Sequence, residues 1–301
     1  MQATNKLLDL LQQGDFKTIA RCISMVENDL PGSEDLLLLL KHQTKTQIVG
    51  ITGPPGAGKS TLVNALLFEC IQQQKKVAVL SVDPSSPFNY GALLGDRIRM
   101  RDFYLHPDVY IRSLASRGSL GGLNAKMIEI LHVLQASNFD YIFIETVGVG
   151  QSEVDIAGIA DTTLVVMVPE AGDEVQTMKA GIMEIADIFV VNKSDRDQAD
   201  VFAKNLAALA HSKATTWEIP VVKCIASSNE GVHELMKKIN LHQQYIHTHQ
   251  DKQFLLLAEK AYQLIQQKRM KDIDKKVLLS ELKNKSQNEN FNLFEWVKSS
   301  F

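Results

Sequence analysis

Short runs of apolar residues alternate with longer amphipathic stretches between about residue 46 and residue 245. The runs are rich in β-branched side chains, and polar residues do not alternate with the apolar ones. This pattern is typical of strands that are buried on both faces of a parallel sheet. Amphipathic stretches such as 60–73, 124–136 and 176–186 separate most runs and predict helices. The pattern therefore predicts an α/β fold, with a mainly parallel central sheet flanked by helices. The expected strands are 47–52, 77–82, 109–113, 141–145, 163–168, 188–192 and 221–224.

The two ends of the chain show no strand pattern. Apolar residues recur at helical spacing over residues 4–30, with a break at Gly14-Asp15. The Pro31-Gly32 pair ends this segment before a further helix start at Ser33. Beyond about residue 250, residues 254–264 and 277–282 also indicate helices. We therefore predict a helical collar over 1–45, a central domain over 46–245 and a C-terminal helical extension over 246–301.

Composition narrows the classes of protein that this chain can belong to. It has 301 residues, with 32 Lys and Arg against 35 Asp and Glu, and a formal net charge of −3. Non-specific binding of nucleic acid needs a basic field, so no nucleic-acid partner is expected. No apolar run reaches the ~20 residues that span a bilayer, and the first residues are too polar for a signal peptide. The three cysteines lie far apart, which excludes a disulfide framework, and we expect a cytoplasmic protein without a membrane partner.

A glycine-rich segment, GPPGAGKS, follows the first expected strand and opens a helix. It matches the P-loop pattern G-x-x-x-x-G-K-[ST] in the required strand–loop–helix context. Its glycines allow consecutive backbone N–H groups to point at phosphate oxygens, and the helix N-terminus adds positive potential. Lys59 is expected to reach the β- and γ-phosphates, and the Ser60 hydroxyl to bind Mg²⁺. The predicted phosphate-binding residues are Gly53, Pro54, Pro55, Gly56, Ala57, Gly58, Lys59 and Ser60.

A second motif, Asn192-Lys193-Ser194-Asp195, follows a later strand and predicts which base is bound. A carboxylate such as that of Asp195 can accept two hydrogen bonds from N1–H and the 2-amino group of guanine, and adenine would leave it unpaired. The Lys193 stem can lie on the base plane, while Asn192 ties the loops together. We expect a further contact to O6 of guanine from a backbone N–H after the last strand, contributed by Ile225, Ala226 or Ser227.

The strand at 141–145 ends in an acid and is followed by a glycine three residues on. Glu145 is suited to hold Mg²⁺ directly or through water, together with Ser60. Asp83, at the end of a neighbouring strand, and Asp96 are further candidates, and the sequence leaves open which of them contacts the metal. The expected metal ligands are Ser60, Asp83, Asp96 and Glu145.

The segment after Glu145 predicts how the bound nucleotide is hydrolysed. The N–H of Gly148 is expected to contact the γ-phosphate. Small GTPases carry a water-orienting Gln directly after this glycine, whereas here Val149 follows and Gln151 comes two positions later. We therefore predict slow intrinsic hydrolysis that a partner or a dimer activates, with Lys59, Glu145, Gly148 and Gln151 as the catalytic residues.

Long segments of the chain closely resemble the methylmalonyl-CoA mutase-associated GTPases, the chaperones of adenosylcobalamin-dependent mutases. The resemblance covers about residues 15–240 and is carried by SVDPSSPF, GALLGDRIRM, FDYIFIETVGVGQSEVDIA and AGIMEIADIFVVNKSD. It implies a metallochaperone-class G protein that binds GTP or GDP with Mg²⁺, extends the phosphate contacts to Thr61, and forms a homodimer through its C-terminal helices.

The same resemblance implies a partner. The protein would dock on an adenosylcobalamin-dependent acyl-CoA mutase, methylmalonyl-CoA mutase by default, gate its cofactor loading and protect it from inactivation. The segment around Asp173 and Lys179 resembles the family's additional switch, which couples the nucleotide state to the mutase.

Two alternative functions remain to be weighed. Relatives are also described as transport-system ATPases or kinases, which suggests a P-loop phosphotransferase, but the sequence shows no clear Arg-bearing lid over an acceptor. A nickel-type metallochaperone GTPase would use His242, His247 and His249. No cysteine accompanies these histidines, and a solvated polar segment is the favoured interpretation.

Overall fold

The computed structural model describes residues 2–40, 45–83, 100–115, 124–146, 155–171, 184–211, 216–273, 275–286 and 291–300. The chain divides into two compact units, Met1–Leu257 and Ala258–Phe301, which are described separately below. Among the described residues, no helix has both the length and the apolar character needed to cross a membrane.

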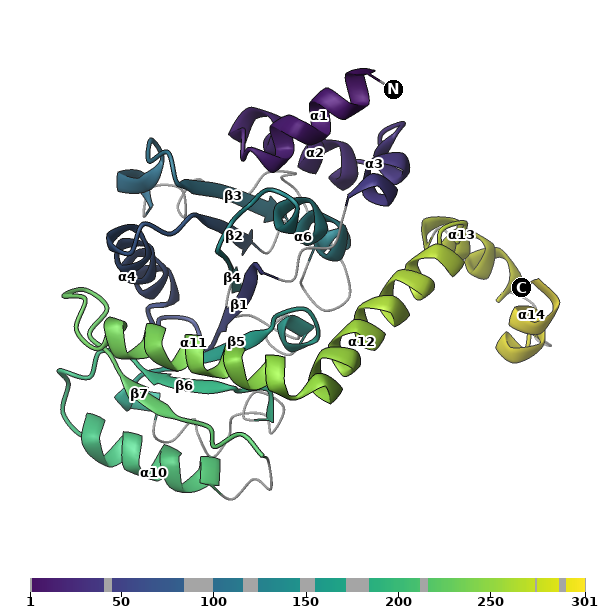
Figure 1. The fold of residues 1–301 in the computed structure, drawn as a ribbon. Helices are drawn as coiled ribbons and strands as arrows, with labels where there is room; N and C mark the ends of the chain where they lie inside the picture. Colours follow the sequence, from purple (N-terminus) through teal and green to yellow (C-terminus); the bar gives the residue numbers. More distant parts are fainter. Residues whose placement is uncertain are drawn as a thin grey trace. The chain divides into compact units, whose positions relative to one another are not determined.

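A seven-stranded sheet forms the centre of the first unit, with the strand order β3-β2-β4-β1-β5-β6-β7 (Figure 1). Every pairing of neighbouring strands is parallel, which confirms the predicted fold class. The strands are β1 (Gln47–Thr52), β2 (Val77–Asp83), β3 (Val109–Ala115), β4 (Tyr141–Thr146), β5 (Thr162–Met167), β6 (Ile188–Val191) and β7 (Val221–Lys223).

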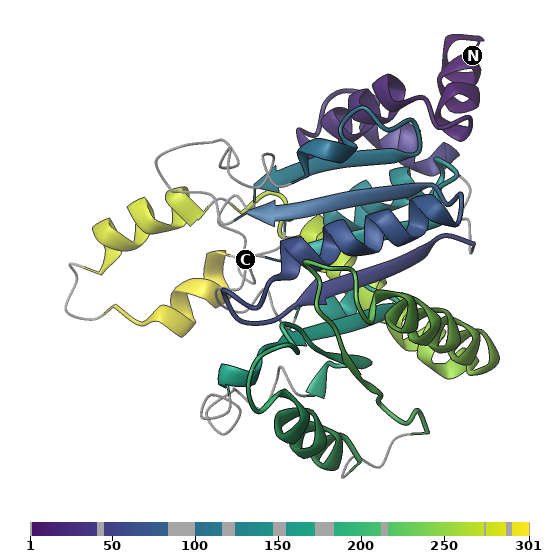
Figure 2. The same ribbon diagram turned by 90° about the vertical axis from the view of Figure 1, so that its left-hand side faces the viewer.

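Helices cover both faces of the sheet (Figure 2). As a result, every residue of the central strands β1, β4 and β5 is buried. Alternate residues of each strand enter different cores: Ile48 packs with the helices of one face and Val49 with those of the other. The first face carries α1 (Gln2–Gln12), α2 (Phe16–Glu27), α3 (Ser33–Leu39), α6 (Met127–Gln135) and α10 (Ala199–His211). The second face carries α4 (Lys59–Gln72) and α11 (Val232–Thr248).

The N-terminal helices are part of the packing of the first unit. The helical segment predicted over 4–30 forms two helices that separate at the predicted Gly14-Asp15 break. There the Asp15 carboxylate caps α2 by accepting a hydrogen bond from the Thr18 N–H at 2.8 Å. Hydrogen bonds from the side chain and the backbone N–H of Thr18 lower the pKa of Asp15. Arg112 of β3 then fixes α2 to the sheet edge through an ion pair with Glu27 at 2.7 Å.

The second unit consists of helical segments. It contains the later part of α12 (Gln250–Arg269), together with α13 (Lys275–Lys285) and α14 (Leu293–Ser300).

Three short 3-10 helices complete the described chain: η1 (Arg101–Phe103), η2 (Ile156–Gly158) and η3 (Pro169–Ala171). The boundaries predicted for the collar, the central domain and the extension stay predictions. The predicted helix over 176–186 lies largely outside the described residues.

Candidate functional site

Three predicted motifs follow the carboxyl ends of β1, β4 and β6. The first two strands are neighbours in the middle of the sheet, and β6 lies one strand beyond β5 (Figure 1). Because all strands are parallel, the carboxyl ends of these strands lie at one edge of the sheet, where ligands of open α/β sheets bind. The contacts below show which predicted residues this edge brings together.

The loop after β1 has the backbone of a phosphate cradle. Gly53, Gly56 and Gly58 have φ values of 139°, 79° and 85°, which residues other than glycine rarely adopt. A Cβ atom on Gly53 would lie 2.1 Å from the backbone oxygen of Val166, and one on Gly58 would lie 2.4 Å from Nδ2 of Asn192. Glycine is therefore required at Gly53 and Gly58 by both conformation and space.

Lys59 begins α4 and folds back over this loop. Its Nζ donates hydrogen bonds to the backbone oxygens of Gly53 at 2.7 Å and Pro54 at 3.0 Å, and the residue is only 7% exposed. The Lys59 ammonium group is thus held against the start of the phosphate loop, next to the N-terminus of α4, which also favours anions.

Ser60 and Glu145 bring two oxygen donors together from different elements. The Ser60 hydroxyl, in the first turn of α4, donates a hydrogen bond to Oε1 of Glu145 on β4 at 2.6 Å, and both residues are buried. A hydroxyl and a carboxylate at this separation are hard oxygen ligands of the kind that Mg²⁺ prefers, so this pair fits the metal that the sequence predicts.

The other predicted metal and catalytic residues are only partly described. Asp83 is the last residue of β2, and its backbone pairs with Ala115 of β3. Since Ser81 of β2 lies opposite Glu145 of β4, Asp83 lies at the same sheet edge, two residues further along. Its side chain is outside the described structure. Asp96, Gly148 and Gln151 of the predicted site, and Asp173 and Lys179 of the predicted switch, also lie outside the described residues.

Asn192 connects the phosphate loop to the loop after β7. Its Nδ2 donates to the backbone oxygen of Ala57 at 2.8 Å, and its Oδ1 accepts from the N–H of Ala226 at 3.1 Å. The residue is 2% exposed, so neither hydrogen bond competes with bulk water. One side chain therefore sets the spacing between the two predicted nucleotide-binding loops.

The residues after Asn192 lie close to the phosphate loop as well. Lys193 has a φ of 56°, and its Nζ donates to the backbone oxygen of Gly56 at 2.8 Å. The N–H of Ser194 donates to the backbone oxygen of Cys224 at 3.1 Å, which joins this motif to the end of β7. Asp195 is exposed, so a ligand can reach its carboxylate.

Two of the three residues after β7 that are predicted to contact guanine donate their N–H groups within the protein. The N–H of Ile225 donates to the backbone oxygen of Glu230 at 3.0 Å, and that of Ala226 donates to Asn192. The contact from Ser227 to O6 of guanine stays a prediction.

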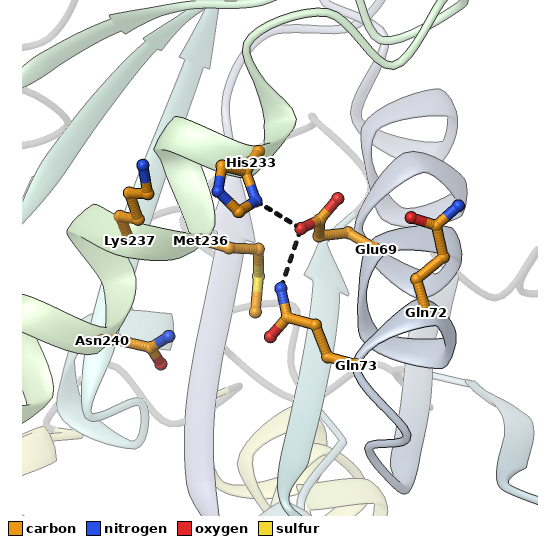
Figure 3. A pocket seen from close by; sticks show the side chains of 7 residues that line it. All are labelled: Glu69, Gln72, Gln73, His233, Met236, Lys237 and Asn240. Carbon is orange, nitrogen blue, oxygen red and sulfur yellow. Dashed lines mark hydrogen bonds and ion pairs between the residues drawn. The ribbon is translucent and has the colours of Figure 1, made fainter.

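A cavity of about 540 Å³ lies between α4 and α11, apart from these motifs (Figure 3). The Glu69 carboxylate on its wall accepts hydrogen bonds from Gln73 at 2.8 Å and pairs with His233 at 2.7 Å. The contact with His233 holds the pKa of Glu69 below its usual range. None of the predicted site residues is among the residues that line this cavity, which are Glu69, Gln72, Gln73, His233, Met236, Lys237 and Asn240.

The histidines near residue 245 do not form a metal centre. His242, expected from the sequence to be solvated, is fully buried, with Nδ1 2.8 Å from the Thr162 hydroxyl and Nε2 3.3 Å from the Asp187 carboxylate. That expectation was wrong because α11 packs this turn onto the amino ends of β5 and β6. Over the described ranges, no group of three His, Cys, Asp or Glu side chains is arranged to hold a metal ion.

Two contacts near the site have no counterpart in the sequence motifs. The hydroxyls of Thr52 and Thr146 lie 3.1 Å apart where β1 and β4 end. Arg196, after the Asn-Lys-Ser-Asp motif, pairs with Glu170 of η3. The signal that could have revealed the first pair is the polar residue directly before Gly53 and directly after Glu145.

A glycine-rich loop between a central parallel strand and a helix, with Lys59 and Ser60 at the helix start, defines a P-loop nucleoside triphosphatase. Residues 19–282 match the family model described as Methylmalonyl Co-A mutase-associated GTPase MeaB, and the chain belongs to that family. The predicted resemblance is thereby confirmed.

Individual relatives agree with this assignment. The chain is 46% identical over 252 residues to a putative GTPase of Pyrococcus horikoshii, covering 82% of this chain and 80% of that protein. It is 34% identical over 253 residues to the mouse mitochondrial methylmalonic aciduria type A homolog, covering 77% and 61%. A crystal structure titled LAO/AO transport system kinase has a TM-score of 0.75 at 24% identity, covering 99% of this chain and 96% of that one, and supports the fold.

Proposed function

We propose that this GTPase uses the edge described above to bind GTP and GDP with Mg²⁺, and that it docks on an adenosylcobalamin-dependent acyl-CoA mutase. The observation that carries the nucleotide part is the bridge made by Asn192, which joins a P-loop to a guanine-type loop through two buried hydrogen bonds. The family description, which names methylmalonyl-CoA mutase, supports the partner.

The proposed roles follow from the contacts. Residues 53–61 surround the phosphates, with the Lys59 ammonium exchanging its bonds to loop carbonyls for phosphate oxygens. Asp195 accepts hydrogen bonds from guanine, Lys193 lies along the base, and the Ser227 N–H donates to O6.

The proposed metal ligands lie on the other side of the phosphate loop. Ser60 and Glu145 would hold Mg²⁺, with Asp83 or Asp96 as a further ligand. When bound, the ion neutralises charge on the β- and γ-phosphate oxygens. Gly148 would contact the γ-phosphate, and the position of Gln151 would make intrinsic hydrolysis slow.

We further propose that the chain forms a homodimer through its C-terminal helices. Many apolar side chains of the second unit are exposed, and large exposed apolar surfaces mark interaction sites. They include Tyr262, Ile265, Met270, Val277, Leu279 and Phe294.

The test is phosphate release from GTP, measured with and without a purified methylmalonyl-CoA mutase. Slow release that the mutase accelerates is expected, and Lys59→Ala should abolish both the basal and the stimulated rate. Candidate small-molecule acceptors are included with radiolabelled GTP in parallel. Label transferred to an acceptor, rather than released as phosphate, would show that the protein is a phosphotransferase.

A further inference from the structure

Two buried threonines meet where the strands that carry the phosphate loop and the acidic residue end. The Thr146 hydroxyl lies 3.1 Å from the Thr52 hydroxyl and 3.4 Å from the backbone oxygen of Ile51. Both threonines are 0% exposed. A hydroxyl in this setting has no access to bulk water, so the contact between the strands supplies a hydrogen bond that solvent cannot.

The two threonines lie just beyond the last backbone pairing between their strands. β1 and β4 are parallel neighbours, and the last backbone pairing between them is Ile51 opposite Glu145. Thr52 and Thr146 come one residue later on each strand. Their hydroxyls therefore extend the connection between the strands by one residue, to the point where Gly53 begins the phosphate loop.

Glu145 depends on that connection. Its carboxylate must lie at the Ser60 hydroxyl, yet Ser60 is carried by α4, on the far side of the phosphate loop. Successive side chains of a strand point to opposite faces, so Thr146 points away from Glu145 and can act on it only through the backbone of β4. Any shift of the end of β4 relative to β1 would change the separation between Ser60 and Glu145.

We propose that Thr52 and Thr146 are positioning residues, whose hydroxyl pair holds the Glu145 carboxylate at Ser60 and thereby sets how strongly Mg²⁺ tightens GTP binding. The inference rests on the proposed function, because it takes Ser60 and Glu145 as metal ligands.

The test compares the affinity of a fluorescent, non-hydrolysable GTP analogue in Mg²⁺ with its affinity in EDTA. The ratio of the two dissociation constants isolates the contribution of the metal, and no turnover is required. Thr146→Val keeps the shape and removes the hydroxyl. We expect it to reduce the ratio by about three- to tenfold, the effect of one lost net hydrogen bond, and to leave GDP affinity in EDTA unchanged.

Two further variants separate positioning from stability. Thr146→Ser keeps the hydroxyl and should restore the wild-type ratio. Thr162→Val removes another buried hydroxyl, the one that contacts His242 at the opposite end of the sheet. It should lower the free energy of unfolding without changing the Mg²⁺ ratio.

A wild-type ratio in folded Thr146→Val would overturn the inference and leave the proposed function intact, since the wild-type protein would still bind GTP with Mg²⁺. The inference is also wrong if Thr146→Ser behaves like the valine variant. If Thr146→Val does not fold, Thr52→Val decides. It leaves Thr146 the Ile51 oxygen as acceptor, so a fall of about twofold supports the inference and no change refutes it. A wild-type protein that binds no guanine nucleotide would overturn both proposals.

Discussion

Removal of the Asn192 side chain is the most direct perturbation of the bridge between the two nucleotide loops. Asn192→Ala deletes the donor to the Ala57 oxygen and the acceptor for the Ala226 N–H, at 2.8 and 3.1 Å. Each abandoned backbone group is buried, and an unsatisfied buried group costs about 1–3 kcal/mol. Some relaxation and water entry is expected in the space left, so we expect a loss of about 2–4 kcal/mol in the free energy of unfolding.

The same change should weaken nucleotide binding, because the phosphate loop and the base loop lose their fixed spacing. A misplacement worth about 1.4 kcal/mol corresponds to tenfold in the dissociation constant, so GTP affinity should fall at least tenfold. Urea denaturation and fluorescent-nucleotide titration measure the two effects. Asn205→Ala, an exposed position on α10, is the matched control and should change stability by less than about 0.5 kcal/mol. The reasoning fails if the two variants behave alike in both assays.

Three further outcomes are expected. Asp195→Asn should weaken GTP binding and reduce the preference for guanine, since each charged hydrogen bond is worth about 1.5–3 kcal/mol. Competition with ATP and inosine triphosphate measures the base preference. Unchanged selectivity would contradict the assignment of Asp195 to the base. Arg112→Leu removes the ion pair that the largely buried Glu27 makes at 2.7 Å, so urea denaturation should show a loss of about 2 kcal/mol. The more exposed Lys75→Leu should lose less than about 1 kcal/mol. Burial raises the pKa of Cys70 to about 12, whereas an unfolded thiol titrates near ~8.5. The unfolded state therefore loses this proton first, and stability should fall as pH rises above about 8.5, with a smaller fall in Cys70→Ala in the same denaturation assay.

The strands could be predicted closely from the sequence, and the reason is physical. A parallel strand buried on both faces must be a continuous apolar run, and the run 47–52 became β1 with the same bounds. The phosphate loop was equally recognisable, because Gly53 and Gly58 are required by local backbone geometry. Hydrogen bonds between distant segments were harder to foresee. Asn192 was expected to tie loops together, but its acceptor at Ala57 depends on how β6 lies relative to β1.

Buried polar residues explain most of what the sequence did not reveal. His242 lies in a stretch with several histidines and glutamines, so local composition indicates solvent. In the fold it is enclosed by Thr162 and Asp187, which are far away in the sequence. The Thr52–Thr146 contact has the same origin, since threonine at a strand end is unremarkable until its neighbour is known. Sequence periodicity reports which face is apolar, whereas polar partners across the core are set by strand order.

The net charge of −3 is likewise a property of the whole sequence that does not reveal how the protein binds a nucleotide. A chain with this balance has no general attraction for the several negative charges of a nucleoside triphosphate. The structure concentrates positive charge instead. Lys59 and Lys193 both donate to backbone oxygens of the phosphate loop, at 2.7, 3.0 and 2.8 Å, so two ammonium groups are held at the loop before any ligand contributes. Lys59 is buried, so its interaction with phosphate is screened far less by salt than a surface field would be. Affinity for the nucleotide should therefore follow the geometry of this loop rather than the charge of the chain.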